Sequence, residues 1–309
     1  MAAAFRKFRK LKIGDRLWVV APSGPLRSRK DFYGGVEILM RAFGVEVRRS
    51  VFAAKGFFAG SDLLRRREMN RAIGQAGCSA IYAMRGGYGV TRILEGIDWR
   101  AWESAPKPVI GLSDLTALHF ALLSRGLGFG IHAPSVPALR RQPGKYVKHL
   151  FRLLLDASCD FAPPPVKLAP LRRGRARGPL VGGNLTMIDQ LTGTGFMPGL
   201  DGCILLLEDV NEPAYKIDRM LVHLKQAGIL GRAAGIVLGR FTRCGSGKGK
   251  VSLKEVFMDN FGPLRVPVAA GFPAGHGQRN WAFVQGAGIT MTCGAGSVEM
   301  AQPQKGMGD

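Results

Sequence analysis

A serine, a glutamate and a histidine stand where amide hydrolysis would need a nucleophile, an orienting carboxylate and a general base. Ser113 follows the apolar run 109–112 and precedes a helical pattern, so we expect it at the C-terminal edge of a parallel sheet. The dipole of the following helix would favour negative charge there. The surrounding pattern is Gly-x-Ser-Asp, not the Gly-x-Ser-x-Gly of α/β-hydrolases. Because a Ser-Asp pair before a helix is more often a cap, Ser113 needs partners to count as a nucleophile.

His276 and Glu208 are the candidate partners. Glycines flank His276 on both sides, which fits a loop that folds tightly around a substrate. Glu208 ends the apolar run 203–207, and a carboxylate there costs free energy unless it is paired. Pairing with His276 would fix the imidazole tautomer and stabilise the imidazolium. A salt bridge from Glu208 to Arg219 or Lys216 is an alternative. Other carboxylates also lie close in sequence, namely Asp209, Glu212 and Asp218.

The segment Arg85–Gly89 reads Arg-Gly-Gly-Tyr-Gly and follows the expected strand 80–84. Its glycines would let backbone amides approach a ligand as an oxyanion hole or an anion nest. A plain tight turn is the alternative. Nucleotide binding has little support, because the loop is not Gly-x-Gly-x-x-Gly and no Walker lysine follows.

The remaining histidines and the five cysteines carry no metal-site spacing. His132 follows a short apolar run and is expected to line the cleft. His119 lies on the helix after Ser113, whereas His149 and His223 are expected to be surface or packing residues. We predict no metal and no other cofactor.

The elements that must position these residues alternate between strands and helices in the first half of the chain. This order predicts an α/β fold with a parallel sheet covered by helices on both faces. The expected strands are 17–21, 45–47, 80–84 and 109–112, and the expected helices are 30–43, 61–76 and 115–124.

The segment 160–178 is rich in proline and arginine and has no periodicity, which is typical of an interdomain linker. We therefore expect an N-terminal α/β domain over 1–159 that carries the nucleophile. A second domain over 179–309 would carry the glutamate and the histidine. In it we expect strands at 203–207 and 235–238, and antiparallel strands at 281–285 and 289–292.

The composition is that of a globular protein with a strongly basic balance. The net charge is +22, from 44 basic and 22 acidic residues, which raises the alternative of a nucleic-acid or anion binder. The basic residues are scattered, however, and no known nucleic-acid motif accompanies them, so a solvated basic surface is favoured. No apolar run is long enough for a membrane helix, and the run 17–22 is too short for a signal peptide. We expect a cytoplasmic protein.

Six segments in order resemble one family, the LD-carboxypeptidases or muramoyltetrapeptide carboxypeptidases. This family of serine peptidases also includes microcin C self-immunity hydrolases. The segments are LWVVAPSGP, MRGGYGVTRILEGIDW, PKPVIGLSDLTALHFAL, LLLEDVNEPAYKIDRML, GIVLGRFTRC and VAAGFPAGHG. The sequence departs from the family in having Leu112 where an aromatic residue often precedes the serine. It also has Ala133 where a His-Gly-Pro turn is usual, which would alter the cleft.

The resemblance implies a fold and a site. The N-terminal domain would resemble class I glutamine amidotransferases, and a smaller C-terminal mixed β/α domain would complete the active site between them. Ser113, Glu208 and His276 would form the triad, and the backbone amides of Gly87 and Asp114 would form the oxyanion hole. The expected substrate contacts are Arg85, Gly86, Tyr88 and His132.

The resemblance also implies an activity. The chain would hydrolyse the amide before the C-terminal D-alanine of murein tetrapeptide during wall recycling. The resemblance further implies a homodimer, and no specific nucleic acid or membrane partner. The alternative within the family is a microcin C-type hydrolase of peptidyl-nucleotide conjugates. The distant alternative is a non-catalytic anion or nucleic-acid binder.

Overall fold

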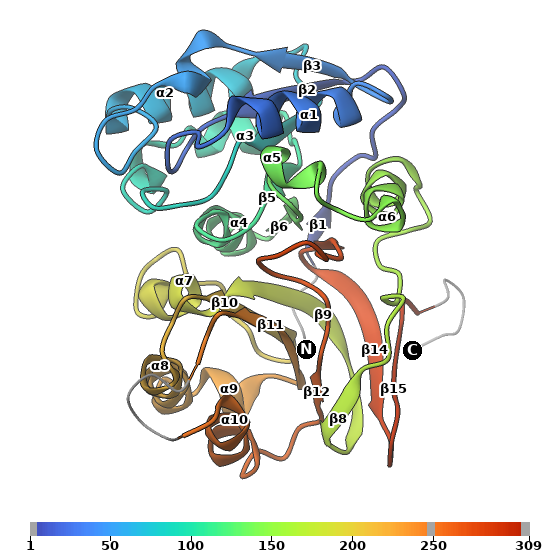
Figure 1. The fold of residues 1–309 in the computed structure, drawn as a ribbon. Coiled ribbons are helices and arrows are strands. Elements are labelled where there is room, and N and C mark those ends of the chain that lie inside the picture. The colour runs from blue at the N-terminus through green and yellow to red at the C-terminus, as the bar shows by residue number, and fades with distance from the viewer. Residues whose placement is uncertain (1–4, 246–250, 304–309) are drawn as a thin grey trace.

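The computed structural model describes residues 5–245 and 251–303, which form two large sheets with their helices, one above the other in Figure 1, and a separate two-stranded sheet. The N-terminal sheet has the order β13-β7-β5-β4-β2-β3. Its neighbours are parallel except for β13, which is antiparallel to β7. The predicted parallel sheet is therefore confirmed. Its strands are β2 (Arg16–Val20), β3 (Gly44–Val47), β4 (Ala80–Ala83), β5 (Val109–Gly111), β7 (Gly130–His132) and β13 (Phe283–Val284).

Helices flank this sheet, and several begin at the caps that the sequence indicates. The side chain of Ser61 accepts a hydrogen bond from the amide of Leu64 at 3.2 Å, which starts α2. All four residues of β4 are buried, as expected for a parallel strand covered on both faces. The helices are α1 (Arg29–Leu39), α2 (Asp62–Gly74), α3 (Trp99–Ser104), α4 (Leu115–Leu123), α5 (Val136–Leu139) and α6 (Gly144–Leu155), with 3-10 turns η1 (Arg49–Phe52) and η2 (Leu94–Gly96).

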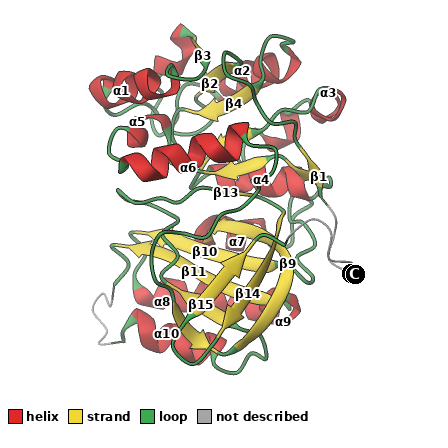
Figure 2. Cartoon of the chain, turned by 90° about the vertical axis from the view of Figure 1, so that its right-hand side faces the viewer, coloured by secondary structure: helices red, strands yellow, loops and turns green. Residues whose placement is uncertain are grey.

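The C-terminal sheet is mixed and has the order β15-β14-β9-β10-β11-β12-β8. The four strands from β9 to β12 in this order are parallel, and the outer strands are antiparallel to their neighbours. In Figure 2, β14 and β15 face the viewer and α8, α9 and α10 lie behind the sheet. The elements are β8 (Ala169–Arg172), β9 (Gly174–Asn184), α7 (Leu185–Leu191), β10 (Ile204–Val210), α8 (Ala214–Gln226), α9 (Ile229–Arg232), β11 (Gly235–Thr242), α10 (Leu253–Phe261), β12 (Val268–Ala270), β14 (Ala287–Cys293) and β15 (Val298–Ala301).

The expected linker differs from the structure in its second half, because residues 169–172 form β8 and residues 174–178 begin β9. β8 is an edge strand, where Pro170 costs no ladder hydrogen bond. In β9, Ala176 is buried between exposed Arg175 and Arg177, which is the alternation of a strand with one wet face. We propose that residues 156–168, which have no regular structure, form the connection between the domains.

The chain also crosses between the two expected domains at a second point, because β13, from the C-terminal half, adds an edge to the N-terminal sheet. Within the expected N-terminal domain, β1 (Arg6–Lys7) pairs with β6 (Leu127–Gly128). The division at residue 179 is thus not a clean one. Among the described residues, no helix is both long and apolar enough to cross a bilayer.

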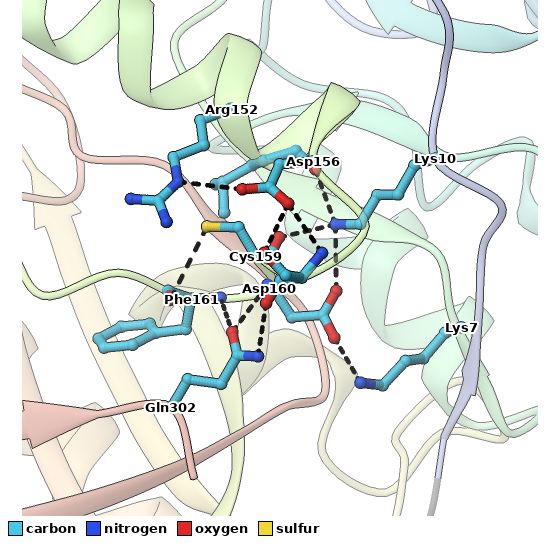
Figure 3. A network of polar contacts seen from close by, with 10 residues as sticks. Lys7, Lys10, Arg152, Asp156, Cys159, Asp160, Phe161 and Gln302 are labelled. Atoms are coloured by element: carbon cyan, nitrogen blue, oxygen red, sulfur yellow. Dashed lines mark hydrogen bonds and ion pairs between the residues drawn. The ribbon is translucent and has the colours of Figure 1, made fainter. Parts of the chain in front are cut away.

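A polar network around Asp160 fastens the connection to both ends of the chain (Figure 3). The ammonium groups of Lys7 and Lys10 bind the Asp160 carboxylate, the second at 3.0 Å. The side-chain oxygen of Gln302 accepts from the amides of Asp160 and Phe161, each at 2.8 Å. Burial alone would raise the pKa of Asp160, but the two lysines outweigh burial and lower it.

Candidate active site

Ser113 lies in a strained turn between β5 and α4. Its φ is +66°, one of few positive values at a described residue other than glycine. Such backbone strain persists where the surrounding structure enforces it, and it clusters at functional sites. The Ser113 carbonyl accepts from the amide of Thr116 at 2.8 Å, which starts the first turn of α4. The side chain is therefore presented, partly exposed, at the C-terminal edge of the sheet, as predicted.

The glycine-rich loop packs directly against this turn. A Cβ added to Gly86 would lie 2.7 Å from the Ser113 Cβ and 3.1 Å from its Oγ, so only glycine fits there. Gly87 has a φ of +132°. The buried carboxylate of Asp114 accepts from the amide of Val90 at 2.9 Å and ties the end of the loop to the serine turn.

The predicted oxyanion donors are the amides of Gly87 and Asp114. Neither amide donates a hydrogen bond to an acceptor in the described part of the chain. Both amides therefore have no acceptor among the described residues, and their role as oxyanion donors stays a prediction.

Glu208 lies opposite an irregularity in the neighbouring strand. The pairing of β10 with β11 shifts register between Leu207 and Asp209, so that Glu208 faces two residues of β11, Gly239 and Arg240, which form a β-bulge. Bulges re-aim side chains and are frequent beside active sites. The Glu208 side chain is fully buried, and a Cβ at Gly275 would lie 2.6 Å from its Oε2. The glycine before His276 thus lets the loop approach the carboxylate.

His276 Nδ1 donates a hydrogen bond to Glu208 Oε2 at 2.8 Å. This bond leaves Nε2 of the imidazole as the proton acceptor, the tautomer that a general base requires. Burial alone would raise the pKa of Glu208, but the facing histidines lower it to about 2. Burial opposes charging of His276 as well, yet the Glu208 carboxylate outweighs it and raises the pKa of the imidazole.

The structure distinguishes Glu208 from the other carboxylates nearby. Asp209 accepts from the Asn184 amide group at 2.8 Å and from the Thr186 amide and hydroxyl, so it holds the start of α7. Glu212 pairs with Lys216 at 3.3 Å, and Asp218 accepts from Asn260 at 2.8 Å. Among the described carboxylates, only Glu208 hydrogen-bonds to His276.

His132 occupies a different place from the one expected. It is fully buried and does not line an open cleft, so the expectation of a substrate contact is corrected. Its ring stacks on Phe283, with centroids 4.9 Å apart, and its Nε2 lies 3.7 Å from Glu208 Oε1. His132 thus faces the oxygen of Glu208 that His276 does not use. The sequence carried only a weak signal for this, a histidine at the end of a strand.

The serine and the glutamate come from different domains that meet beside them. Asn184 pairs with Glu208 in the C-terminal sheet, and its amide donates to the hydroxyl of Thr116, in the first turn of α4, at 3.1 Å. His132 in turn pairs with Gly111, two residues before the serine. No hydrogen bond joins Ser113 to His276 in the described structure. In ligand-free enzymes such catalytic contacts are often long and tighten with substrate.

Comparison with known proteins places this site in a family. Models of the LD-carboxypeptidase N-terminal and C-terminal domains match residues 17–133 and 177–291. A putative carboxypeptidase of Synechocystis is 39% identical over 87% of this chain and 89% of its own. The murein tetrapeptide carboxypeptidase of Pseudomonas aeruginosa is 30% identical over 89% of this chain and 92% of its own. The chain belongs to the LD-carboxypeptidase family.

A solved structure agrees with this assignment at the level of the fold. The microcin C7 self-immunity protein MccF of Escherichia coli, in an inactive mutant apo state, superimposes with a TM-score of 0.86. It covers 96% of this chain and 98% of its own at 21% identity. This match confirms the two-domain α/β fold, and the family models and relatives confirm the assignment as a serine-type LD-carboxypeptidase. The triad remains a prediction, and the described residues contain no cluster of three or more metal-ligating side chains.

Proposed function

We propose that the chain is a serine carboxypeptidase that removes the C-terminal D-alanine from murein tetrapeptide. The observation that carries the proposal is the hydrogen bond from His276 Nδ1 to the buried Glu208 carboxylate, 2.8 Å long. It orients a histidine as a general base in a family that includes a relative named murein tetrapeptide carboxypeptidase.

In the proposed mechanism, Ser113 Oγ attacks the carbonyl carbon before D-alanine while His276 Nε2 takes its proton. The amides of Gly87 and Asp114 stabilise the oxyanion of the tetrahedral intermediate. His276 then gives its proton to the departing amine of D-alanine, which leaves an acyl-enzyme. Water, activated by the same histidine, hydrolyses the acyl-enzyme and restores Ser113.

Glu208 supports each of these proton transfers in the proposal. Its negative charge stabilises the imidazolium that forms whenever His276 holds the proton. Because Glu208 is fully buried, this interaction is weakly screened by solvent.

The first test is D-alanine release from purified murein tetrapeptide in the presence of EDTA. We expect release by the wild type, loss of at least 10³-fold in Ser113→Ala, and no loss in Ser124→Ala at the far end of α4. Turnover by a folded Ser113→Ala protein at the wild-type rate would refute the mechanism. If neither the wild type nor the variant releases D-alanine, murein tetrapeptide is refuted as the substrate.

The place of action and the assembly are further parts of the proposal. We infer that the enzyme acts in the cytoplasm on wall peptides returned for recycling, and that it forms a homodimer. Cell fractionation tests the cytoplasmic location, and light scattering of the purified protein tests the homodimer.

A second candidate is hydrolysis of peptidyl-nucleotide conjugates, because the fold matches MccF and an arginine-lined cavity adjoins the site. A panel of aminoacyl sulfamoyl adenosines against murein peptides separates the two activities. Nucleic-acid binding through the +22 charge is the distant alternative. It predicts that the chain binds long DNA or RNA duplexes whether or not it has peptidase activity. This binding should weaken steeply as the salt concentration rises.

A further inference from the structure

A cavity of about 450 Å³ lies beside the candidate triad. Its wall includes the guanidinium groups of four arginines, the turn residue after the candidate base, and a single carboxylate. These residues are Arg27, Arg85, Arg141, Arg243, Gly277 and Asp31.

The charge of this wall is strongly positive even after internal pairing. Asp31 is already bound by Arg141 and lies 3.8 Å from Arg140, so it neutralises little of the remaining charge. Burial lowers the pKa of Arg85, and the positive charge of Arg27 lowers it further. Several guanidinium groups around one cavity, one of them half-buried, are a typical site for a carboxylate or a phosphate.

Two of these arginines are held in place by other groups. Arg85 donates to the carbonyl of Pro25 at 2.8 Å, which fixes its half-buried guanidinium. Arg243 Nε donates to the side-chain oxygen of Asn211 at 2.7 Å. Both Arg243 and Asn211 have positive φ, +53° and +61°, although neither is glycine. Strain of this kind in two facing turns indicates that the position of Arg243 matters.

The cavity lies on the histidine side of the candidate site. Gly277 directly follows His276, and the charge of Arg243 acts on the His276 imidazole. Arg85, which also lines the cavity, precedes Gly86, and Gly86 contacts the Ser113 turn. The group that receives a proton from the histidine is the departing amine, so the cavity adjoins the position of the residue that leaves.

We propose that this cavity binds the free carboxylate of the departing C-terminal residue, with Arg85 and Arg243 as its donors. This assignment rests on the proposed carboxypeptidase function and explains why cleavage would stop at one residue from the end. A substrate whose chain continues past this residue, or whose C-terminus is amidated, has a neutral group in place of the carboxylate. It therefore lacks the charge-assisted hydrogen bonds to the arginines. A nucleotide phosphate has the same anionic chemistry and is the competing source.

The test compares murein tetrapeptide with its C-terminal carboxamide as substrates. The wild type should cleave the acid with the higher kcat/KM. Arg85→Gln and Arg243→Gln should each lower kcat/KM for the acid about 10- to 150-fold, because each variant loses one hydrogen bond between charged groups. The kcat/KM for the amide should hardly change. The control, Arg232→Gln, loses a surface ion pair with Asp201 far from the cavity and should keep the discrimination. Arg243 is exposed, so its variant should fold even if that of Arg85 does not.

Equal losses on acid and amide, or unchanged discrimination, would overturn the assignment while leaving the peptidase proposal intact. Should the wild type cleave neither peptide, the proposed function fails, and calorimetry with N-acetyl-D-alanine, its amide and adenosine monophosphate still tests the cavity. Binding of N-acetyl-D-alanine alone, lost in Arg243→Gln, supports the carboxylate site. Binding of the nucleotide alone, or of neither anion, overturns it.

Discussion

Replacing Glu208 by glutamine removes the negative charge from the buried partner of His276 and nearly keeps the shape of the side chain. The glutamine can turn its NH₂ group toward His276 Nδ1, which then has to accept a hydrogen bond instead of donating one. The imidazole would carry its proton on Nε2, the atom that must receive the proton of Ser113.

The magnitude follows from two contributions. A hydrogen bond to a charged group contributes about 1.5–3 kcal/mol, so losing it in the transition state lowers the rate roughly 10- to 150-fold. The reversed tautomer adds to this, and the equivalent change in a serine protease triad lowers kcat about 10⁴-fold. We therefore expect D-alanine release by Glu208→Gln to fall to about 10⁻⁴ of the wild-type rate.

The pH dependence gives a second readout. His276 must be neutral to act as a base, so wild-type kcat/KM rises as the pH passes upward through its raised pKa. In Glu208→Gln the carboxylate that outweighs burial is gone, so the pKa of the imidazole falls and the acid limb of the profile moves to lower pH. A profile measured from pH 4 to 9 on the folded variant tests this. The matched control is Glu255→Gln, an exposed helix-cap residue whose profile should follow the wild type.

The same pair makes stability depend on pH. Because the pKa of Glu208 is lowered to about 2, its contribution is present above the usual carboxyl pKa and is lost as the pH falls toward 2. Because the pKa of His276 is raised, its contribution is present below its usual pKa and is lost as the pH rises through the raised value.

An acid limb of the Glu208→Gln profile that does not move, together with a loss of rate below tenfold, would refute this account of Glu208.

Two further perturbations test the surroundings of the pair, and a third tests the network around Asp160. His132→Phe keeps the stack on Phe283 but removes the nitrogen facing Glu208, so kcat should fall about tenfold with KM unchanged; an unaltered kcat and pH profile would contradict this positioning role. Gly275→Ala puts a Cβ against Glu208 at a φ of +121°, so stability should fall by about 1–3 kcal/mol in urea melts, with activity lost; wild-type activity would contradict it. Asp160→Asn should cost roughly 1.5–3 kcal/mol at pH 7. That difference should vanish as the pH falls through the lowered pKa of Asp160, and a constant difference down to pH 2 would contradict the pairing.

Part of the site could be predicted because its signals are local. A serine after a short buried strand and before a helix has to lie at the C-terminal edge of a parallel sheet, and Ser113 does. Glycines around a histidine indicate a backbone that must pass close to something, and at Gly275 that neighbour is Glu208. By contrast, the proline-rich run 160–178 has the composition of a linker, yet its second half pairs into a sheet, because an edge position tolerates proline.

The sequence by itself determined the family and the alternating α/β order, and it predicted three residues for amide hydrolysis. Composition and spacing left Glu208 undistinguished from Asp209 and Glu212, and only the family resemblance selected it, because the direction of a side chain depends on the packing around its strand. In the tertiary structure Glu208 lies opposite a bulge in β11 and hydrogen-bonds to His276, while Asp209 binds the start of α7. The tertiary structure also placed His132 beside Glu208 and gathered arginines from four distant segments around one cavity. Such convergence depends on how two domains pack, which no local pattern encodes.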